Sequence, residues 1–241
     1  MNVPTVAPGT YRLFVAIEIP EAVQSEVGRR IEPLRESLSA GGKTRWVDPR
    51  GLHLTLLFLG DIAADLVPWL GQELARACAP SPTFSLALSG AGTFPPTRPA
   101  RVAWVGVSTP PELIALRSAL NAMAEETIGH PSEEGPFVPH LTIARCRDPW
   151  QRPAIATFTT AFSGAIGEPF PVAEAVLVRS HLGEIVSRGD GTQGQGSRHE
   201  VLLRMPLGIA PATERAEEAE EKTEEESHEA PSDPRPEEGA V

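Results

Sequence analysis

Along the chain, short runs of apolar residues alternate with longer segments in which apolar residues recur every three or four positions. The short runs are typical of buried strands, and the periodic segments are typical of amphipathic helices. The expected strands are residues 11–19, 43–47, 52–59, 84–89, 101–107, 137–145, 172–180 and 200–205. The expected helices are residues 20–38, 61–79, 109–123 and 151–162. Strands follow one another directly as often as they flank a helix, which favours an α+β fold with antiparallel pairing over a doubly wound parallel sheet.

Prolines set the expected boundaries of these helices. Pro20 stands at a tolerated first-turn position of the first helix. Pro33 interrupts the same pattern, so we expect a kink or a break near Glu32. Thr109 is expected to cap the third helix. The expected apolar faces are Val23, Val27, Ile31, Leu34 and Leu38 in the first helix, Leu66, Leu70 and Leu74 in the second, and Leu113, Leu116, Leu120 and Met123 in the third.

The net charge of −11 is concentrated at the C-terminal end of the chain. Residues 210–241 hold eleven Glu and one Asp against two Arg and one Lys, a net charge of −9, which leaves −2 for residues 1–209. A segment with so few large apolar side chains cannot bury enough surface to offset the entropy of ordering it. We therefore expect a folded domain over residues 1–209 and a disordered acidic tail over 210–241, which either solubilises the protein or acts as an autoinhibitory polyanion.

Composition excludes several classes of protein. No stretch approaches the ~18 consecutive apolar residues of a membrane span, and no basic run precedes the short apolar segment near the N-terminus, as a secretory signal would require. Cys78 and Cys146 form no metal-ligand spacing and suit a reducing cytoplasm. Because no His, Cys or carboxylate cluster has ligand spacing either, we expect the protein to be independent of metal ions. We also expect a cytoplasmic protein that needs no cofactor and is a monomer.

One tripeptide occurs twice. His53-Leu54-Thr55 returns as His140-Leu141-Thr142, 87 residues later and again inside an apolar strand. Chance placement would give about 0.04 such tripeptides in this chain. The repeat and its matching context indicate an internal duplication, in which each of two similar lobes contributes one H-x-T strand.

Alternate residues of a strand point to the same face, so each histidine projects beside its threonine. Two such pairs facing one another would place four polar groups around one ligand. Threonine hydroxyls can donate to phosphate oxygens, and two imidazoles that titrate near pH ~6.5 can divide the general-base and general-acid roles. These side chains are suited to catalyse a displacement at phosphorus without a metal ion.

These motifs resemble the paired signatures of the 2H phosphoesterases. The segments concerned are His53-Leu-Thr-Leu-Leu-Phe-Leu-Gly60 and Pro139-His-Leu-Thr-Ile-Ala-Arg145. Within that superfamily the chain is most similar to the RNA 2′,3′-cyclic phosphodiesterases, once described as 2′-5′ RNA ligases. The resemblance covers roughly residues 11–207. It departs from the family pattern near the end, where 187–198 is a longer glycine-rich insertion and His199 stands where an aromatic residue is common.

The resemblance implies a bilobal α+β fold, with two pseudo-symmetric lobes built on antiparallel sheets around a central cleft. It implies hydrolysis of a terminal RNA 2′,3′-cyclic phosphate to a 2′-phosphate. His53 would be the proton donor and His140 the proton acceptor, while Thr55, Thr142 and Arg145 would bind the phosphate. Strict alternation puts Arg145 on the face opposite His140, so this role requires that the arginine leave the strand or follow a bulge.

Other functions remain alternatives at this stage. The same groups could catalyse the reverse 2′-5′ joining of RNA ends. The substrate could instead be a small cyclic nucleotide or an ADP-ribose cyclic phosphate, or the protein could be an RNA-end-binding module without catalysis. The glycine pattern at 189–194 has no helix after it, so we interpret it as a hairpin loop. Trp46, close to the first motif, is interpreted as a packing residue, with base stacking as the alternative.

Overall fold

The computed structural model describes residues 9–39, 43–96, 100–130, 136–187 and 193–209. Helices and antiparallel strands are both present, so the predicted α+β class is confirmed. The strands are β1 (Thr10–Glu18), β2 (Thr44–Trp46), β3 (His53–Ala63), β4 (Phe84–Phe94), β5 (Ala100–Val107), β6 (His140–Trp150), β7 (Ala165–Val172), β8 (Glu174–Ser187) and β9 (Gln193–Pro206). The helices are α1 (Glu21–Ser39), α2 (Val67–Cys78), α3 (Pro111–Ile128) and α4 (Arg152–Ala161), with short 3-10 turns at Pro49–Gly51 and Ala64–Leu66.

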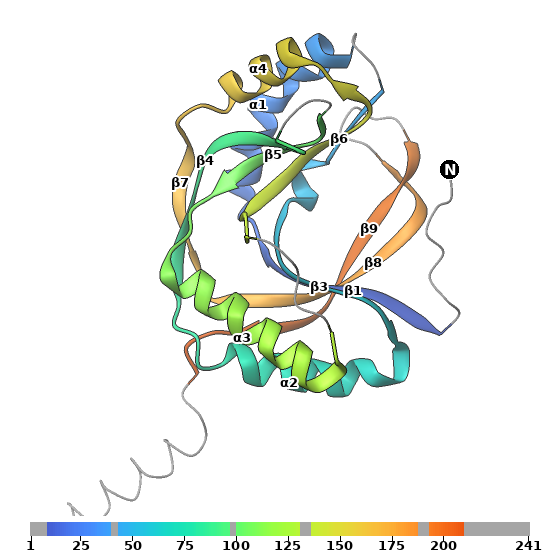
Figure 1. Ribbon diagram of the computed structural model, residues 1–241, viewed down its shortest axis with the longest axis vertical. Helices are drawn as coiled ribbons and strands as arrows, with labels where there is room; N and C mark the ends of the chain where they lie inside the picture. Colours follow the sequence, from blue (N-terminus) through green and yellow to red (C-terminus); the bar gives the residue numbers. More distant parts are fainter. Residues whose placement is uncertain (1–8, 40–42, 97–99, 131–135, 188–192, 210–241) are drawn as a thin grey trace, which may run out of the picture. The chain divides into compact units, whose positions relative to one another are not determined.

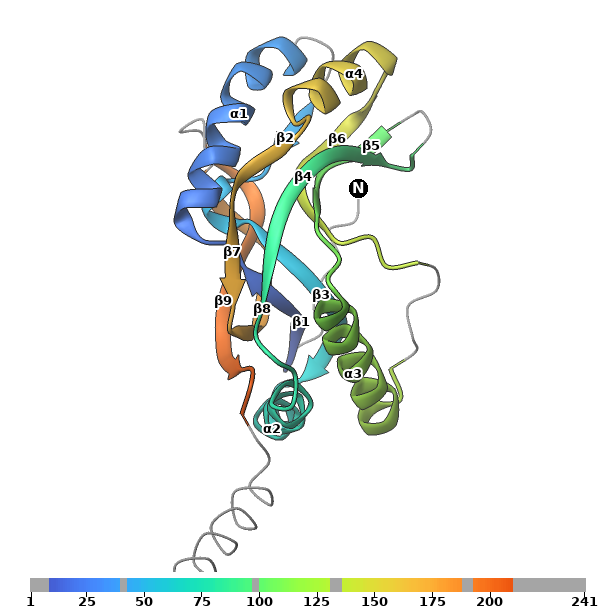
Figure 2. The ribbon, with the colours of Figure 1, turned by 90° about the vertical axis from the view of Figure 1, so that its left-hand side faces the viewer.

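The strands form two sheets in which every pairing is antiparallel. The first sheet has the order β3-β1-β8-β9, and the second has the order β2-β6-β5-β4-β7. Helices α2 and α3 pack against the first sheet and against each other, whereas α1 and α4 pack against the second (Figure 1). Turning the molecule shows each pair of helices at its own end of the fold, with the strands between them (Figure 2). Each sheet thus carries its own helical layer, as the two-lobe prediction requires.

The order of elements repeats between the two halves of the chain. In the first half, β1 and β3 pair antiparallel, and the helix between them, α1, packs on the other sheet. In the second half, β5 and β6 pair antiparallel, and the helix between them, α3, again packs on the opposite sheet. The helices that follow, α2 and α4, each cover the sheet of the strand before them. This exchange of helices makes each lobe depend on both halves of the chain.

Helix α1 runs from Glu21 to Ser39 without a break at Pro33. Of the kink or break expected near Glu32, the break therefore does not occur, and the kink stays a prediction. All five residues of its predicted apolar face are buried. Pro33 itself is exposed and does not belong to the buried face. Burial of the opposite face outweighs the one hydrogen bond that a helical proline removes.

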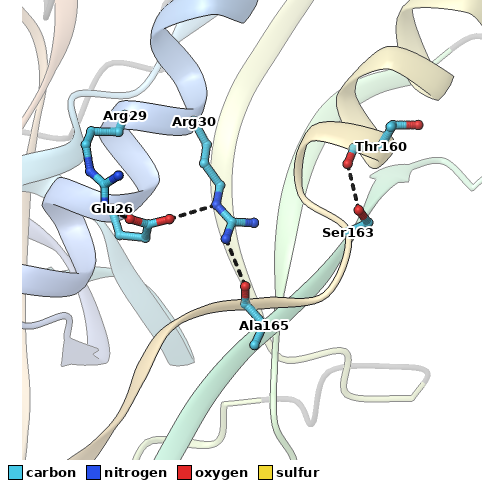
Figure 3. A network of polar contacts seen from close by, with 6 residues as sticks. All are labelled: Glu26, Arg29, Arg30, Thr160, Ser163 and Ala165. Atoms are coloured by element: carbon cyan, nitrogen blue, oxygen red, sulfur yellow. Dashed lines mark hydrogen bonds and ion pairs between the residues drawn. The ribbon is translucent and has the colours of Figure 1, made fainter.

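Polar contacts fix α1 to the outer strand of the second sheet (Figure 3). The guanidinium of Arg30 forms an ion pair with Glu26, one turn earlier in the helix, at 2.9 Å. It also donates to the carbonyl oxygen of Ala165 at 2.9 Å. Arg29 pairs with the same carboxylate. At the end of α4, the Ser163 hydroxyl donates to a carbonyl of the last helical turn, at 2.8 Å. These contacts position the helical layer over β7.

Several predicted boundaries were wrong. Strand β3 continues to Ala63, so the second helix begins later than residue 61, and Leu66 is 46% exposed rather than part of the buried face. The cap of α3 is Pro110, not Thr109, and it makes no side-chain cap hydrogen bond. Strand β7 was not predicted, because its prolines and glycine hide the alternating pattern. Tertiary pairing with β4 stabilises this strand despite its composition.

The strands that flank the glycine-rich segment pair with each other. Strands β8 and β9 pair from Glu174 with Pro206 as far as Ser187 with Gln193. This pairing agrees with the hairpin interpretation, but residues 188–192, which hold most of the predicted loop, lie outside the described residues, as does the acidic tail at 210–241.

Candidate active site

The two repeated motifs lie on neighbouring strands of different sheets. His53 begins β3 and His140 begins β6, and these two strands contact one another where the sheets meet. Burial lowers the pKa of His53, and the positive charges of Arg145 and His140 lower it further. Because such charge effects require proximity, the fold brings together histidines that are 87 residues apart in the sequence.

Both histidines are held by the same local hydrogen bond. Nδ1 of His53 donates to the carbonyl oxygen of Gly51 at 2.9 Å, and Nδ1 of His140 donates to the carbonyl oxygen of Val138 at 2.7 Å. A carbonyl oxygen can only accept, so the proton must be on Nδ1 in each ring. In a neutral ring Nε2 then carries the lone pair. Both rings therefore present Nε2 as the nitrogen available for proton transfer.

The threonines share the face of their histidines. Thr55 and Thr142 are half-buried, like His53 and His140. The residues that alternate with them point into the core and are fully buried, namely Leu54 and Leu56 in β3 and Leu141 and Ile143 in β6. The period-two pattern of the sequence therefore places one hydroxyl beside each imidazole, as predicted.

A β-bulge brings Arg145 to the same face. Thr142 lies opposite Trp104, but Ala144 lies opposite Ala103, so Ile143 is an extra residue on β6. Ile143 and Ala144 are both buried, after which Arg145 is exposed. The bulge reverses the alternation of faces after Ile143, so Arg145 lies on the same face as His140 although strict alternation would place it on the opposite one. The positive charge of Arg145 accordingly reaches His53 and His199 on the facing sheet.

The first lobe has the same bulge with a different residue behind it. Leu56 is the extra residue between the pairs Ala16–Thr55 and Val15–Leu57, so the position that corresponds to Arg145 is Phe58. The guanidinium of Arg12 lies over the Phe58 ring, 4.7 Å from its centroid. Sequence comparison of the two motifs alone would show an arginine in one lobe and a phenylalanine in the other. The residue that follows the bulge is therefore charged in one lobe and aromatic in the other.

Each histidine lies between two other rings. His140 contacts Phe94, with centroids 5.0 Å apart, and Trp104, at 6.1 Å. His53 contacts Phe14 and His199, each at 4.9 Å. Phe14, Ala16, Val176 and Val178 form a separate apolar cluster on this face of the first sheet.

Sequence reasoning did not assign His199 to the site. The only signal was its place in a position where an aromatic residue is common. The residue is exposed at the surface, but the partial burial of its ring lowers its pKa to about 4, and the charges of His53, Arg145 and His181 add to that effect. Trp46, in contrast, is 9% exposed and packs against Trp150 in the core, which supports its interpretation as a packing residue.

Within the described ranges, no three His, Cys, Asp or Glu side chains gather as a metal site would require. In the same part of the chain, no helix combines the length and apolar character needed to cross a bilayer. The groups that face one another here are imidazoles, hydroxyls and a guanidinium. These groups can transfer protons and bind an anion.

Comparison with known proteins gives one consistent family. The model of the 2′-5′ RNA ligase superfamily matches residues 21–184. An RNA 2′,3′-cyclic phosphodiesterase of Thermus thermophilus is 36% identical over 182 residues, which cover 71% of this chain and 82% of the relative. A protein of the same name from Methanothermobacter thermautotrophicus is 29% identical over 171 residues, covering 71% of this chain and 90% of the relative.

Solved structures agree with this result. A crystal structure of a Thermus thermophilus protein superposes with a TM-score of 0.63 at 28% identity, covering 83% of this chain and 100% of the other. The crystal structure of E. coli LigT complexed with 3′-AMP superposes with a TM-score of 0.60 at 28% identity, covering 82% of this chain and 98% of the other. The match extends over nearly the whole length of each solved structure.

Proposed function

The chain belongs to the 2′-5′ RNA ligase superfamily, and on that basis we propose that it hydrolyses the terminal 2′,3′-cyclic phosphate of RNA to a 2′-phosphomonoester. The relatives that match much of its length carry the name RNA 2′,3′-cyclic phosphodiesterase. The observation that carries the proposal is the matched pair of motif histidines, each with Nδ1 bound to the carbonyl two residues earlier. Both Nε2 atoms are thereby kept free for substrate.

In the proposed reaction His140 accepts a proton and His53 donates one. Nε2 of His140 takes a proton from water as the water oxygen bonds to phosphorus. The bond from phosphorus to O3′ breaks, and O3′ receives the proton of His53 Nε2. The products are a 2′-phosphate and a free 3′-hydroxyl. One proton passes from water to His140 and another passes from His53 to O3′, so the protons balance and no atom changes its oxidation state. The proposed reaction therefore uses no oxidant, metal ion or cofactor.

Three side chains would bind the phosphate during this displacement. The hydroxyls of Thr55 and Thr142 can each donate to a non-bridging oxygen, and the guanidinium of Arg145 adds a charge-assisted donor. Arg145 is suited to this task because the bulge at Ile143 turns it to the histidine face. A group that stabilises charge developing on phosphorus lowers the barrier as well as binding substrate.

The role of His53 as donor depends on substrate. Without ligand its pKa is lowered by burial and by the two neighbouring positive charges, so His53 is mostly neutral at neutral pH. A cyclic phosphate carries one negative charge. Placed between His53 and Arg145, that charge offsets the repulsion and favours the protonated ring. The donor would therefore acquire its proton together with the substrate.

The direct test is turnover of a short RNA that ends in a 2′,3′-cyclic phosphate, with excess EDTA present. We expect hydrolysis to a 2′-phosphate at an unchanged rate with EDTA. His53→Ala and His140→Ala should each lose about 10²–10⁴-fold, the usual worth of a positioned acid or base. The double variant should lose less than the product of the two single losses, because the groups act in one transition state.

His130→Ala serves as a matched control, since His130 follows the end of α3 and is not on a motif strand. The two roles can be separated with a substrate whose O3′ is replaced by a better leaving group, which should partly rescue His53→Ala but not His140→Ala. Rescue of His140→Ala alone would reverse the assignment. Full activity of either histidine variant would leave an RNA-end-binding module as the better hypothesis.

The substrate range follows from the same assay. A cyclic mononucleotide and an ADP-ribose cyclic phosphate, compared with the RNA, test the small-molecule alternatives. Addition of an RNA with a free 5′-hydroxyl tests the reverse, 2′-5′ joining reaction. The catalytic domain over 1–209, the monomeric state and the cytoplasmic location stay predictions.

A further inference from the structure

One of the four rings that flank the motif histidines is itself a histidine. Phe94 and Trp104 lie against His140. In the other lobe, Phe14 and His199 lie against His53. Phenylalanine and tryptophan rings carry no proton that titrates, whereas an imidazole does. Among the residues that the structure describes, the pseudo-symmetric arrangement therefore places a third titratable ring against His53 and none against His140.

The geometry of His199 is well defined. Its ring meets the His53 ring at 84° with centroids 4.9 Å apart, and it meets the Phe14 ring at 77° and 5.2 Å. Both contacts are edge-to-face, which is a favoured arrangement of aromatic rings. His199 lies on β9 opposite the buried Ser180 of β8. The ring therefore projects from a paired strand rather than from a loop.

Neighbouring residues hold this part of the hairpin in place. The next residue, Glu200, accepts a hydrogen bond from Nε2 of His181 on β8, at 2.7 Å. This pair ties the two strands together one position away from His199. The backbone that carries the ring is thus fixed from both strands, which is what a positioning role requires.

The groups that face His199 are positively charged when they ionise. They are His53 on β3, Arg145 on β6 and His181 on β8. With burial, they lower the pKa of His199 to about 4, so the ring is neutral when His53 takes a proton. A neutral ring at this position does not repel the protonated His53 ring, whereas a second cation at this distance would.

We propose that His199 is a positioning residue for His53. Its uncharged ring covers one side of the His53 ring and keeps that ring in the orientation in which Nδ1 donates to the carbonyl oxygen of Gly51. This inference rests on the proposed function, because it assigns His53 a proton to transfer. The Nδ1 hydrogen bond fixes one atom of the ring. The contacts with Phe14 and His199 fix the ring plane, and with it the direction of Nε2.

The test combines kinetics with the pKa of His53 measured by NMR. His199→Ala should lower kcat about 10-fold with little change in KM, less than the loss of a proton-transfer group itself. It should also raise the pKa of His53 toward its ordinary value, because water reaches the ring. His199→Phe keeps a ring and should keep both kcat and the low pKa of His53. Val201→Ala, two residues along the same strand and 37% exposed, is the matched control.

The variant His199→Gln tests whether His199 acts through the packing of its ring or through a ring nitrogen that contacts substrate. A positioning ring predicts that Gln behaves like Ala; a nitrogen that contacts substrate predicts that Gln works and Phe does not, which would overturn the proposal. An unchanged kcat and His53 pKa in His199→Ala would also overturn it. If the wild-type protein fails to hydrolyse the cyclic phosphate, the proposed function fails, but the pKa of His53 in the Phe and Gln variants still tests the contact.

Discussion

The indole ring of Trp104 occupies the space that a side chain at Gly92 would fill. A Cβ atom added at Gly92 would lie 2.3 Å from the indole ring of Trp104, a distance that real contacts do not allow. The two residues are cross-strand partners on β4 and β5, and Thr142 is the next partner of Trp104 on β6. The indole in turn contacts Phe94 and His140. A glycine two strands away from the second motif therefore decides where the ring beside His140 can lie.

Gly92→Ala is expected to destabilise the protein by about 1–3 kcal/mol, the usual cost of overpacking, and to slow turnover by displacing Trp104. Chemical denaturation and kcat measure the two effects. Gly51→Ala is the control for the stability measurement alone, because nothing lies within 4 Å of an added Cβ there but its carbonyl oxygen binds His53. Trp104→Phe, a smaller ring, should suppress part of the Gly92→Ala defect. Strictly additive losses in the double variant would contradict this account of the contact.

Arg145→Ala is expected to weaken substrate binding and slow turnover without unfolding the protein. The bulge at Ile143 places this guanidinium near His53, so its removal should also raise the pKa of His53. Arg145→Lys keeps the charge but loses the bidentate geometry and should recover only part of the rate. Arg147→Ala is the matched control, since Arg147 is exposed two residues along the same strand. Equal effects of Arg145→Ala and Arg147→Ala would show that only overall charge matters.

Stability is expected to fall as the pH drops from about 6.5 toward 4, in part because of His53 and His199. Both groups have a folded-state pKa below their ordinary value of 6.5. In this window the unfolded chain binds more protons than the folded protein, so the free energy of unfolding rises with pH. His199→Phe removes one of the two groups and should reduce the loss. Urea titrations of both proteins at pH 7 and pH 4.5 test this, and equal losses would contradict it.

Deleting residues 210–241 is expected to leave turnover within a few-fold and thermal stability nearly unchanged. The reason is compositional: the segment removes nine of the eleven net negative charges but almost no large apolar side chain. Turnover, melting temperature and RNA affinity should be measured on the truncated and full-length chains. A large rise in RNA affinity would support an autoinhibitory polyanion. Loss of folding would contradict the disordered-tail prediction.

The sequence alone identified the two strands that carry the histidine and threonine side chains. The tripeptide at His53 and its repeat at His140 are local patterns, and strand alternation is a local property. The shared face of each histidine and threonine therefore followed directly from the spacing. The α+β class and the buried face of α1 also came from periodicity, which depends only on nearby residues.

Tertiary structure decided the rest, because it depends on which strands pair. The bulge at Ile143 arises from the register of β6 against β5, and no local signal in Pro139–Arg145 marks it. The same holds for Leu56 in β3. His199 reaches His53 only because β9 pairs with β8 and β8 with β1. Contacts between residues so distant in sequence are set by packing and strand pairing across the whole domain, so composition and spacing could not place the third histidine at the site.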